Sequence, residues 1–184
     1  MSISKTKKNT QIPYLEVVPQ LNSLGFVLIP LNEKKPIFKR WNKLTATPEH
    51  LYVFESNNIG ILTGQISNIT VLDIDTKDEG LKIWTNLSSS YPEIITPMAK
   101  TPSGGIHIYF QYNKNLHSFS RFKLRERSIG WDLLNNERQV VAPPSIINKK
   151  KYKWIRSPKT TIIETMPKWL EDYLLNAKSF HRAL

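Results

Sequence analysis

Two acidic side chains end an apolar segment near the middle of the chain. The segment 69–75 reads ITVLDID, which predicts a strand that stays apolar until its carboxyl end. Side chains alternate along a strand, so Asp73 and Asp75 project from one face, about 6.5 to 7 Å apart. Like charges at this spacing resist burial unless a cation lies between them, and Mg²⁺ binds carboxylate oxygens. The pattern also fits a strand that ends in two solvated aspartates before the turn 76–80.

A second candidate group opens a later strand. The segment 101–110 reads TPSGGIHIYF, in which Gly104 and Gly105 allow a sharp turn whose backbone N–H groups can approach an anion. His107 follows on the strand, and an imidazolium beside a glycine turn is a natural phosphate contact. The segment fits equally well an ordinary glycine hairpin turn with a half-buried histidine.

A third carboxylate lies between large apolar residues. The segment 130–134 reads GWDLL, so Asp132 is predicted inside a strand, where aspartate is disfavoured and needs a partner. A role as a third metal ligand would supply that partner. The alternative is an aspartate that begins a turn toward Asn135 and Asn136.

Charge is the informative bulk property of the 184 residues. Lysine and arginine number 26 against 15 acidic residues, so the formal net charge is +11. This surplus favours polyanionic partners, with nucleic acid first. There is no cysteine, which excludes disulfides and thiol chemistry, and no apolar segment long enough to cross a membrane. We expect an intracellular protein without a membrane partner.

The apolar spacing predicts a mixture of helices and strands, hence an α+β domain around a largely antiparallel sheet. Segments 131–134 and 139–142 are predicted to pair as a hairpin joined across 135–137. The other predicted elements are helices at 14–24, 47–55, 81–87 and 165–177, strands at 26–31, 96–101, 106–112 and 152–155, a short strand followed by a tight turn within 58–64, and an irregular basic segment at 113–129.

In this order the motifs resemble the prim-pol branch of the archaeo-eukaryotic primase superfamily. The resemblance covers roughly residues 24–154. The matching motifs are Lys35-Pro36 with Trp41, Asn58-Ile59-Gly60 with Thr63-Gly64, Val71 to Asp75, Thr101 to Phe110, Gly130-Trp131-Asp132 and Val140 to Ser145.

The resemblance implies an RRM-like antiparallel catalytic sheet that is cradled with a smaller N-terminal α/β module. A single prim-pol catalytic domain is expected at 12–178. Within it we expect the N-terminal module at 12–65, the catalytic core at 66–160 and a C-terminal helix at 161–178, with flexible ends at 1–11 and 179–184.

The resemblance also implies roles for individual residues. Two divalent cations, Mg²⁺ or Mn²⁺, are expected on Asp73, Asp75 and Asp132, and His107 is expected to contact nucleotide phosphates. The family often has Ser-x-His, whereas Gly105 stands two residues before His107 here, so glycine amides would substitute. Further nucleotide contacts are expected at Ser103, Gly104, Gly105, Arg138 and Lys35, and DNA contacts at Lys123, Arg125, Arg127, Lys149, Lys150 and Lys151.

The implied activity is that of a DNA primase/polymerase, a nucleotidyltransferase that makes or extends primers on single-stranded DNA from nucleoside triphosphates. Related domains often form the N-terminal part of a larger viral, phage or plasmid primase–helicase, so a helicase in cis or in trans is an expected partner. One alternative is a non-catalytic module for single-stranded DNA binding or origin recognition on the same fold. A replication-initiator nuclease is a weaker alternative, because such enzymes use a His-x-His pair and His107-Ile108-Tyr109 lacks it.

Overall fold

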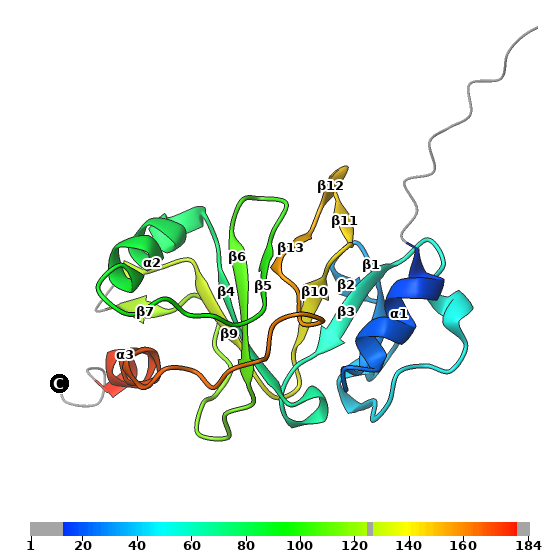
Figure 1. Ribbon diagram of the computed structural model, residues 1–184, viewed down its shortest axis with the longest axis horizontal. Coiled ribbons are helices and arrows are strands. Elements are labelled where there is room, and N and C mark those ends of the chain that lie inside the picture. Colours follow the sequence, from blue (N-terminus) through cyan, green and yellow to red (C-terminus); the bar gives the residue numbers. More distant parts are fainter. Residues whose placement is uncertain (1–12, 125–126, 180–184) are drawn as a thin grey trace, which may run out of the picture.

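The computed structural model describes residues 13–124 and 127–179 as an α+β fold with two main antiparallel sheets (Figure 1). The predicted fold class is confirmed. Of the ends expected to be flexible, 1–11 and 179–184, only Ser179 is among the described residues. Within this described part of the chain, no helix has the length and apolar character needed to cross a membrane.

The larger sheet has five strands in the order β13-β5-β6-β4-β9. Both β4 and β5 pair antiparallel with β6, and α2 lies between them in the chain. They therefore form a split β-α-β unit of the kind found in ferredoxin-like sheets. The elements are β4 (Ile69–Ile74), α2 (Gly80–Ser88), β5 (Met98–Lys100), β6 (Ile106–Gln111), β9 (Trp131–Leu134) and β13 (Lys153–Arg156).

The smaller sheet has four strands in the order β10-β3-β1-β2, and α1 packs against it. Three of its strands come from the N-terminal part of the chain. The fourth, β10, comes from the range 66–160 that was expected to form the catalytic core. The elements are α1 (Tyr14–Asn22), β1 (Leu28–Asn32), β2 (Lys35–Pro36), β3 (Asn58–Leu62) and β10 (Gln139–Ala142).

Short elements complete the described chain. They are the 3-10 turns η1 (Trp41–Lys43), η2 (Leu51–Phe54), η3 (Gln65–Ser67) and η4 (Lys77–Glu79), the strand pairs β7 (Lys123–Leu124) with β8 (Arg127–Ser128) and β11 (Ile146–Ile147) with β12 (Lys150–Lys151), and α3 (Lys168–Ser179).

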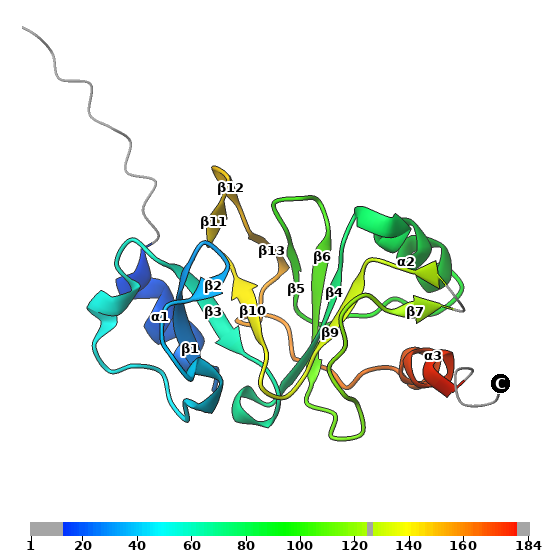
Figure 2. The ribbon, with the colours of Figure 1, turned by 180° about the vertical axis from the view of Figure 1, so that it is seen from behind.

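The predicted hairpin between 131–134 and 139–142 is wrong. β9 pairs with β4, whereas β10 pairs with β3, so the chain passes from one sheet to the other between them (Figure 2). Asn135 explains the difference, because its side chain is buried and anchors the connection. Its amide nitrogen donates to the carbonyl oxygens of Asn113 and Leu116, and its amide oxygen accepts from the Thr70 hydroxyl.

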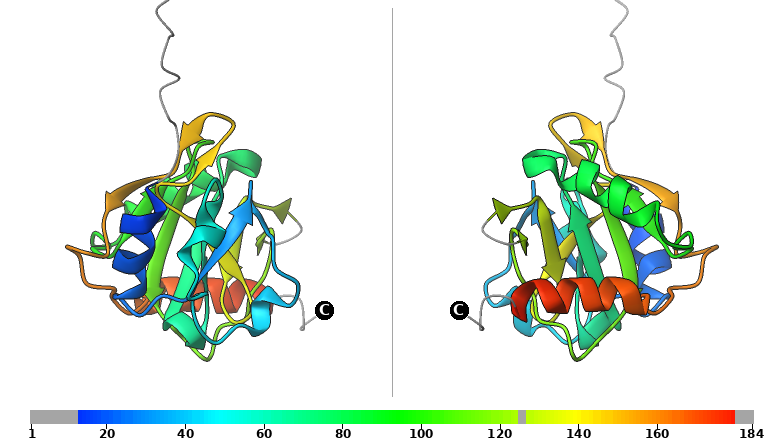
Figure 3. Two further views of the ribbon diagram at one scale, coloured as in Figure 1. Left: turned by 90° about the vertical axis from the view of Figure 1, so that its right-hand side faces the viewer. Right: turned by 90° about the vertical axis from the view of Figure 1, so that its left-hand side faces the viewer.

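β4 is central because both of its faces are buried. Val71 packs in the apolar cluster shared with α1 and the four-stranded sheet. Leu72 and Ile74 pack in the cluster that α2 and α3 cover, and Figure 3 shows both helices on this outer face of the sheet. Burial of each such side chain contributes about 1.5 to 3 kcal/mol. The apolar packing therefore fixes the position of β4 up to the point where its aspartates begin.

Candidate active site

Strand register places Asp73 between two of the predicted site residues. Asp73 lies opposite Asp132 on β9 and opposite His107 on β6. Directly opposed residues project from the same face of a sheet, with Cβ atoms about 4.5 to 5.5 Å apart. The predicted grouping of Asp73, Asp132 and His107 is therefore present in the fold, although they are far apart in the chain.

Asp75 follows the end of β4 and continues the same register. Its backbone N–H donates to the Gly130 carbonyl at 2.7 Å, which keeps it beside the start of β9. Glycine is required around it because the backbones approach so closely. A Cβ on Gly105 would lie 2.4 Å from the Ile74 carbonyl oxygen, and one on Gly130 would lie 2.2 Å from the Lys77 carbonyl oxygen. These close contacts hold the end of β4 firmly between β6 and β9.

The carboxylates affect one another electrostatically. Burial raises the pKa of Asp132 above its usual range, and the negative charges of Asp73 and Asp75 add to this rise. The Arg121 backbone N–H opposes it by donating to Asp132 Oδ1 at 2.6 Å. Three like charges thus interact in a partly buried place, which is unfavourable without a cation.

The donor set fits a divalent cation in its chemistry. Carboxylate oxygens are the ligands that Mg²⁺ and Mn²⁺ prefer, and a cation would relieve the repulsion around Asp132. Across residues 13–124 and 127–179, however, no three His, Asp or Glu side chains are arranged to hold a metal ion as they stand. Asp73 and Asp132 instead have protein partners, namely His107 and the Arg121 amide.

His107 lies behind Asp73 and is only 4% exposed. Its Nε2 is 3.4 Å from Asp73 Oδ1, and its ring centroid is 5.5 Å from that of Tyr152. Its Nδ1 is buried and has no hydrogen-bond partner among the described residues. In this arrangement the imidazole contacts a carboxylate and is not displayed to solvent.

Two tyrosines surround the histidine and Asp73. Burial raises the pKa of Tyr109 and of Tyr152, and the negative charge of Asp73 adds to both rises. Both phenols are therefore neutral at ordinary pH. Tyr109 is fully buried, and its hydroxyl has no hydrogen-bond partner in the described part of the chain.

The β5–β6 turn carries the remaining glycine-motif residues. Gly104 adopts φ +97°, a left-handed conformation that favours glycine, and its N–H donates to the Thr101 carbonyl at 3.0 Å. Ser103 Oγ lies 3.0 Å from Thr101 Oγ1. A Cβ on Gly104 would be 3.5 Å from Thr76 Cγ2, so this turn touches the turn that follows Asp75.

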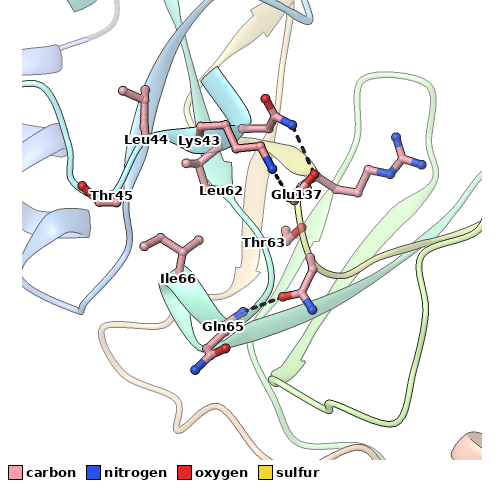
Figure 4. A pocket seen from close by; sticks show the side chains of 11 residues that line it. Lys43, Leu44, Thr45, Leu62, Thr63, Gln65, Ile66 and Glu137 are labelled. Carbon is pink, nitrogen blue, oxygen red and sulfur yellow. Dashed lines mark hydrogen bonds and ion pairs between the residues drawn. The ribbon is translucent and has the colours of Figure 1, made fainter. Parts of the chain in front are cut away.

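Arg138 and Lys35, two of the predicted nucleotide contacts, lie on other elements than the three aspartates. Arg138 lines a pocket of about 620 Å³ beyond the far end of β9, next to the Lys43–Glu137 ion pair (Figure 4). Lys35 is in β2, the edge strand of the four-stranded sheet. No hydrogen bond or ion pair within the described residues joins either side chain to the aspartates. None of the three aspartates lines this pocket.

The predicted DNA-binding cations occupy two hairpins. Lys123 and Arg127 are on the β7–β8 pair, where Arg127 forms an ion pair with Glu79. The other cations, Lys149, Lys150 and Lys151, are exposed on the β11–β12 hairpin, which lies at the same end of the molecule as the β5–β6 turn (Figures 1 and 2). Arg125 lies outside the described residues.

One residue beside the carboxylates was not among the predicted site residues. Arg121 belongs to the basic segment 113–129, and its backbone N–H holds Asp132. Its guanidinium forms an ion pair with Asp78, in the turn after β4. The only sequence signal was positive charge, which does not distinguish Arg121 from its neighbours.

Comparison with known proteins identifies the family. A search of curated proteins finds no match to this chain. The sequence model of the family Prim-Pol, described as "Bifunctional DNA primase/polymerase, N-terminal", matches residues 20–169. The match covers most of the chain and includes both sheets, the three aspartates and His107. The chain therefore belongs to the Prim-Pol family of bifunctional DNA primase/polymerase N-terminal domains.

Proposed function

We propose that this chain makes or extends primers on single-stranded DNA by template-directed nucleotidyl transfer. Membership of the Prim-Pol family supports a primase/polymerase activity. The observation that carries the proposal is the strand register, which sets Asp73 opposite Asp132 with Asp75 at the end of the same strand. Distant parts of the chain thus supply three carboxylates to one face of the sheet.

The three aspartates are proposed to hold two divalent cations, in keeping with the metal dependence of the family. When bound, Mg²⁺ or Mn²⁺ would lower the energy of the attacking and leaving oxygens at the α-phosphate. The task of the protein is then positioning. β4 and β9 orient Asp73 and Asp132, and the Arg121 amide fixes the Asp132 carboxylate.

His107 is proposed to orient Asp73. Its Nε2 lies 3.4 Å from the Asp73 carboxylate, and its burial allows little rotation. Contact with the nucleotide phosphates through His107, Ser103, Gly104 and Gly105 stays a prediction, as do the contacts of Arg138 and Lys35. The β5–β6 turn is the best placed of these, because it touches the turn after Asp75.

The template is proposed to bind through lysine and arginine side chains. Lys123, Arg125, Arg127 and the β11–β12 lysines would contact its phosphates, which carry no sequence information. A helicase in cis or in trans as the source of single strands, a viral, phage or plasmid replication setting and an intracellular location stay predictions from the family resemblance.

The test is nucleotide incorporation on a primed and an unprimed single-stranded template with Mg²⁺ or Mn²⁺. We expect incorporation by the wild type and a loss of roughly 10²-fold or more in Asp73→Asn, as when one transition-state-stabilising group is removed. Asp172→Asn is the control, because Asp172 pairs with Lys168 on α3. Metal-independent DNA binding without incorporation would instead support the non-catalytic DNA-binding alternative.

A further inference from the structure

The segment containing Arg121 runs along the outer edge of β9. Phe119 and Leu133 exchange backbone hydrogen bonds of 3.0 and 2.9 Å, and the Phe122 N–H donates to the Trp131 carbonyl at 2.8 Å. Between these pairs, the Arg121 N–H turns to the Asp132 side chain at 2.6 Å. Arg121 is therefore fixed at its backbone beside one of the three carboxylates.

The Arg121 side chain crosses to the turn that follows β4. Its Nη2 lies 2.6 Å from Asp78 Oδ2, and the side chain is 60% exposed. Asp78 lies in the turn that follows Asp75, so this ion pair links the outer edge of β9 to the end of β4. Its charge also acts on Asp132. A solvent-accessible cation is thus close enough to the carboxylates for its charge to act on one of them.

We propose that Arg121 binds the triphosphate of the incoming nucleotide, exchanging its ion pair with Asp78 for the phosphate oxygens. This inference rests on the proposed function. Exposed ion pairs between side chains contribute little to stability, so the Arg121–Asp78 pair is easily given up. A guanidinium can bind a phosphate through two parallel hydrogen bonds, and such a charge-assisted pair is stronger than an ordinary hydrogen bond. The exchange needs only side-chain rotation, because the Arg121 backbone stays on Asp132.

The backbone of Arg121 provides a clean variant. Arg121 has φ +56°, which glycine adopts without strain. Arg121→Gly therefore removes the guanidinium and keeps the N–H that holds Asp132. Asp78 has φ +48°, a conformation that asparagine tolerates well. Asp78→Asn thus removes the competing carboxylate and leaves Arg121 free for phosphate.

The primary measurement is the affinity of the full chain for a non-hydrolysable nucleoside triphosphate with Mn²⁺, by calorimetry, alongside KM and kcat. Arg121→Gly should weaken nucleotide binding and raise KM by roughly 10- to 100-fold, the effect of losing a charge-assisted hydrogen bond. Asp78→Asn should tighten binding, and in the Arg121→Gly background it should tighten binding much less, because no guanidinium is left to release. Lys82→Ala is the matched control, since Lys82 on α2 pairs with Glu79, which lies in the same turn as Asp78. It should bind nucleotide like the wild type.

Three results would overturn the inference. The first is an Arg121→Gly variant with wild-type nucleotide affinity. The second is an Arg121→Gly variant that keeps its nucleotide affinity but loses affinity for single-stranded DNA, measured separately by fluorescence anisotropy. Arg121 would then be a DNA contact. The third is a wild type that neither binds nucleotide nor incorporates it, in which case the proposed function fails too. If the wild type is active and Arg121→Gly binds nucleotide equally well, only this inference is refuted and the proposed function stands.

Discussion

Asp73 is the residue on which the candidate site converges. Asp132 lies opposite it on one neighbouring strand and His107 on the other. Burial raises the pKa of Asp132, Tyr109 and Tyr152, and the negative charge of Asp73 adds to each of these rises. A residue with this influence is expected to be the most sensitive position of the site.

Asp132→Asn is expected to separate activity from stability. The variant keeps an oxygen that can accept from the Arg121 N–H, but it loses one of three repelling charges. We expect nucleotide incorporation to fall by roughly 10²-fold or more. The melting temperature should stay the same or rise, because a neutral amide carries neither the cost of burying a charge nor the repulsion from the other two aspartates. Single-turnover incorporation and calorimetric melting measure the two effects. A strongly destabilised variant would contradict this account of the repulsion.

Added divalent metal is expected to stabilise the fold by binding to the three aspartates. A cation that binds only the native state raises the melting temperature, by several degrees at about 100 times its Kd for a chain of this size. Titration with Mn²⁺ should therefore give a saturable thermal shift in the wild type and little or none in Asp73→Asn. An equal shift in both proteins would place the metal elsewhere.

Among the elements, the end of β4 and the turn after it depend on glycines that immediately precede two other strands, Gly105 before β6 and Gly130 before β9. Gly105 has an ordinary backbone conformation but no room for a Cβ, whereas Gly25 has φ +86° and nothing within 4 Å of that position. Gly105→Ala thus tests close packing alone, and Gly25→Ala tests backbone strain alone. We expect Gly105→Ala to cost about 1 to 3 kcal/mol and most of the activity, because β4 must shift.

Gly25→Ala should cost about 1 to 2 kcal/mol and leave the specific activity intact. Chemical denaturation gives the free energies of unfolding, and incorporation per folded molecule gives the activity. If Gly105→Ala were as active as Gly25→Ala, the close approach around Asp75 would not matter for catalysis.

Local patterns predicted the elements of the site better than their partners. The apolar run that begins at residue 69 was enough to predict the strand that carries Asp73 near its end. The partner of β9 could not be inferred in the same way, because β9 and β10 are close in sequence and each pairs with a distant strand. The buried side-chain contacts of Asn135 decide this, and no local propensity encodes them. Arg121 was missed for the same reason, since its contacts with Asp132 and Asp78 are non-local.

Across the whole molecule, the cations differ in whether an acidic side chain pairs with them. The net charge is +11, and many of the cations near the carboxylates already have acidic partners, such as Arg127 with Glu79. Lys150 and Lys151 are exposed on β12, and no ion pair involves them among the described residues. They are therefore available to neutralise DNA phosphates.

Replacing Lys150 and Lys151 with alanine is expected to weaken the dependence of template binding on salt. Each phosphate contact to single-stranded DNA contributes about 0.7 to the slope of log K against log salt, so the slope should fall by about 1.4 in magnitude. The double variant Lys82→Ala, Lys168→Ala is the control. It removes the same net charge, but from cations that pair with Glu79 and Asp172. Anisotropy titrations at several salt concentrations give both slopes. Equal slopes in the two double variants would mean that net charge, and not the β11–β12 hairpin, attracts the template.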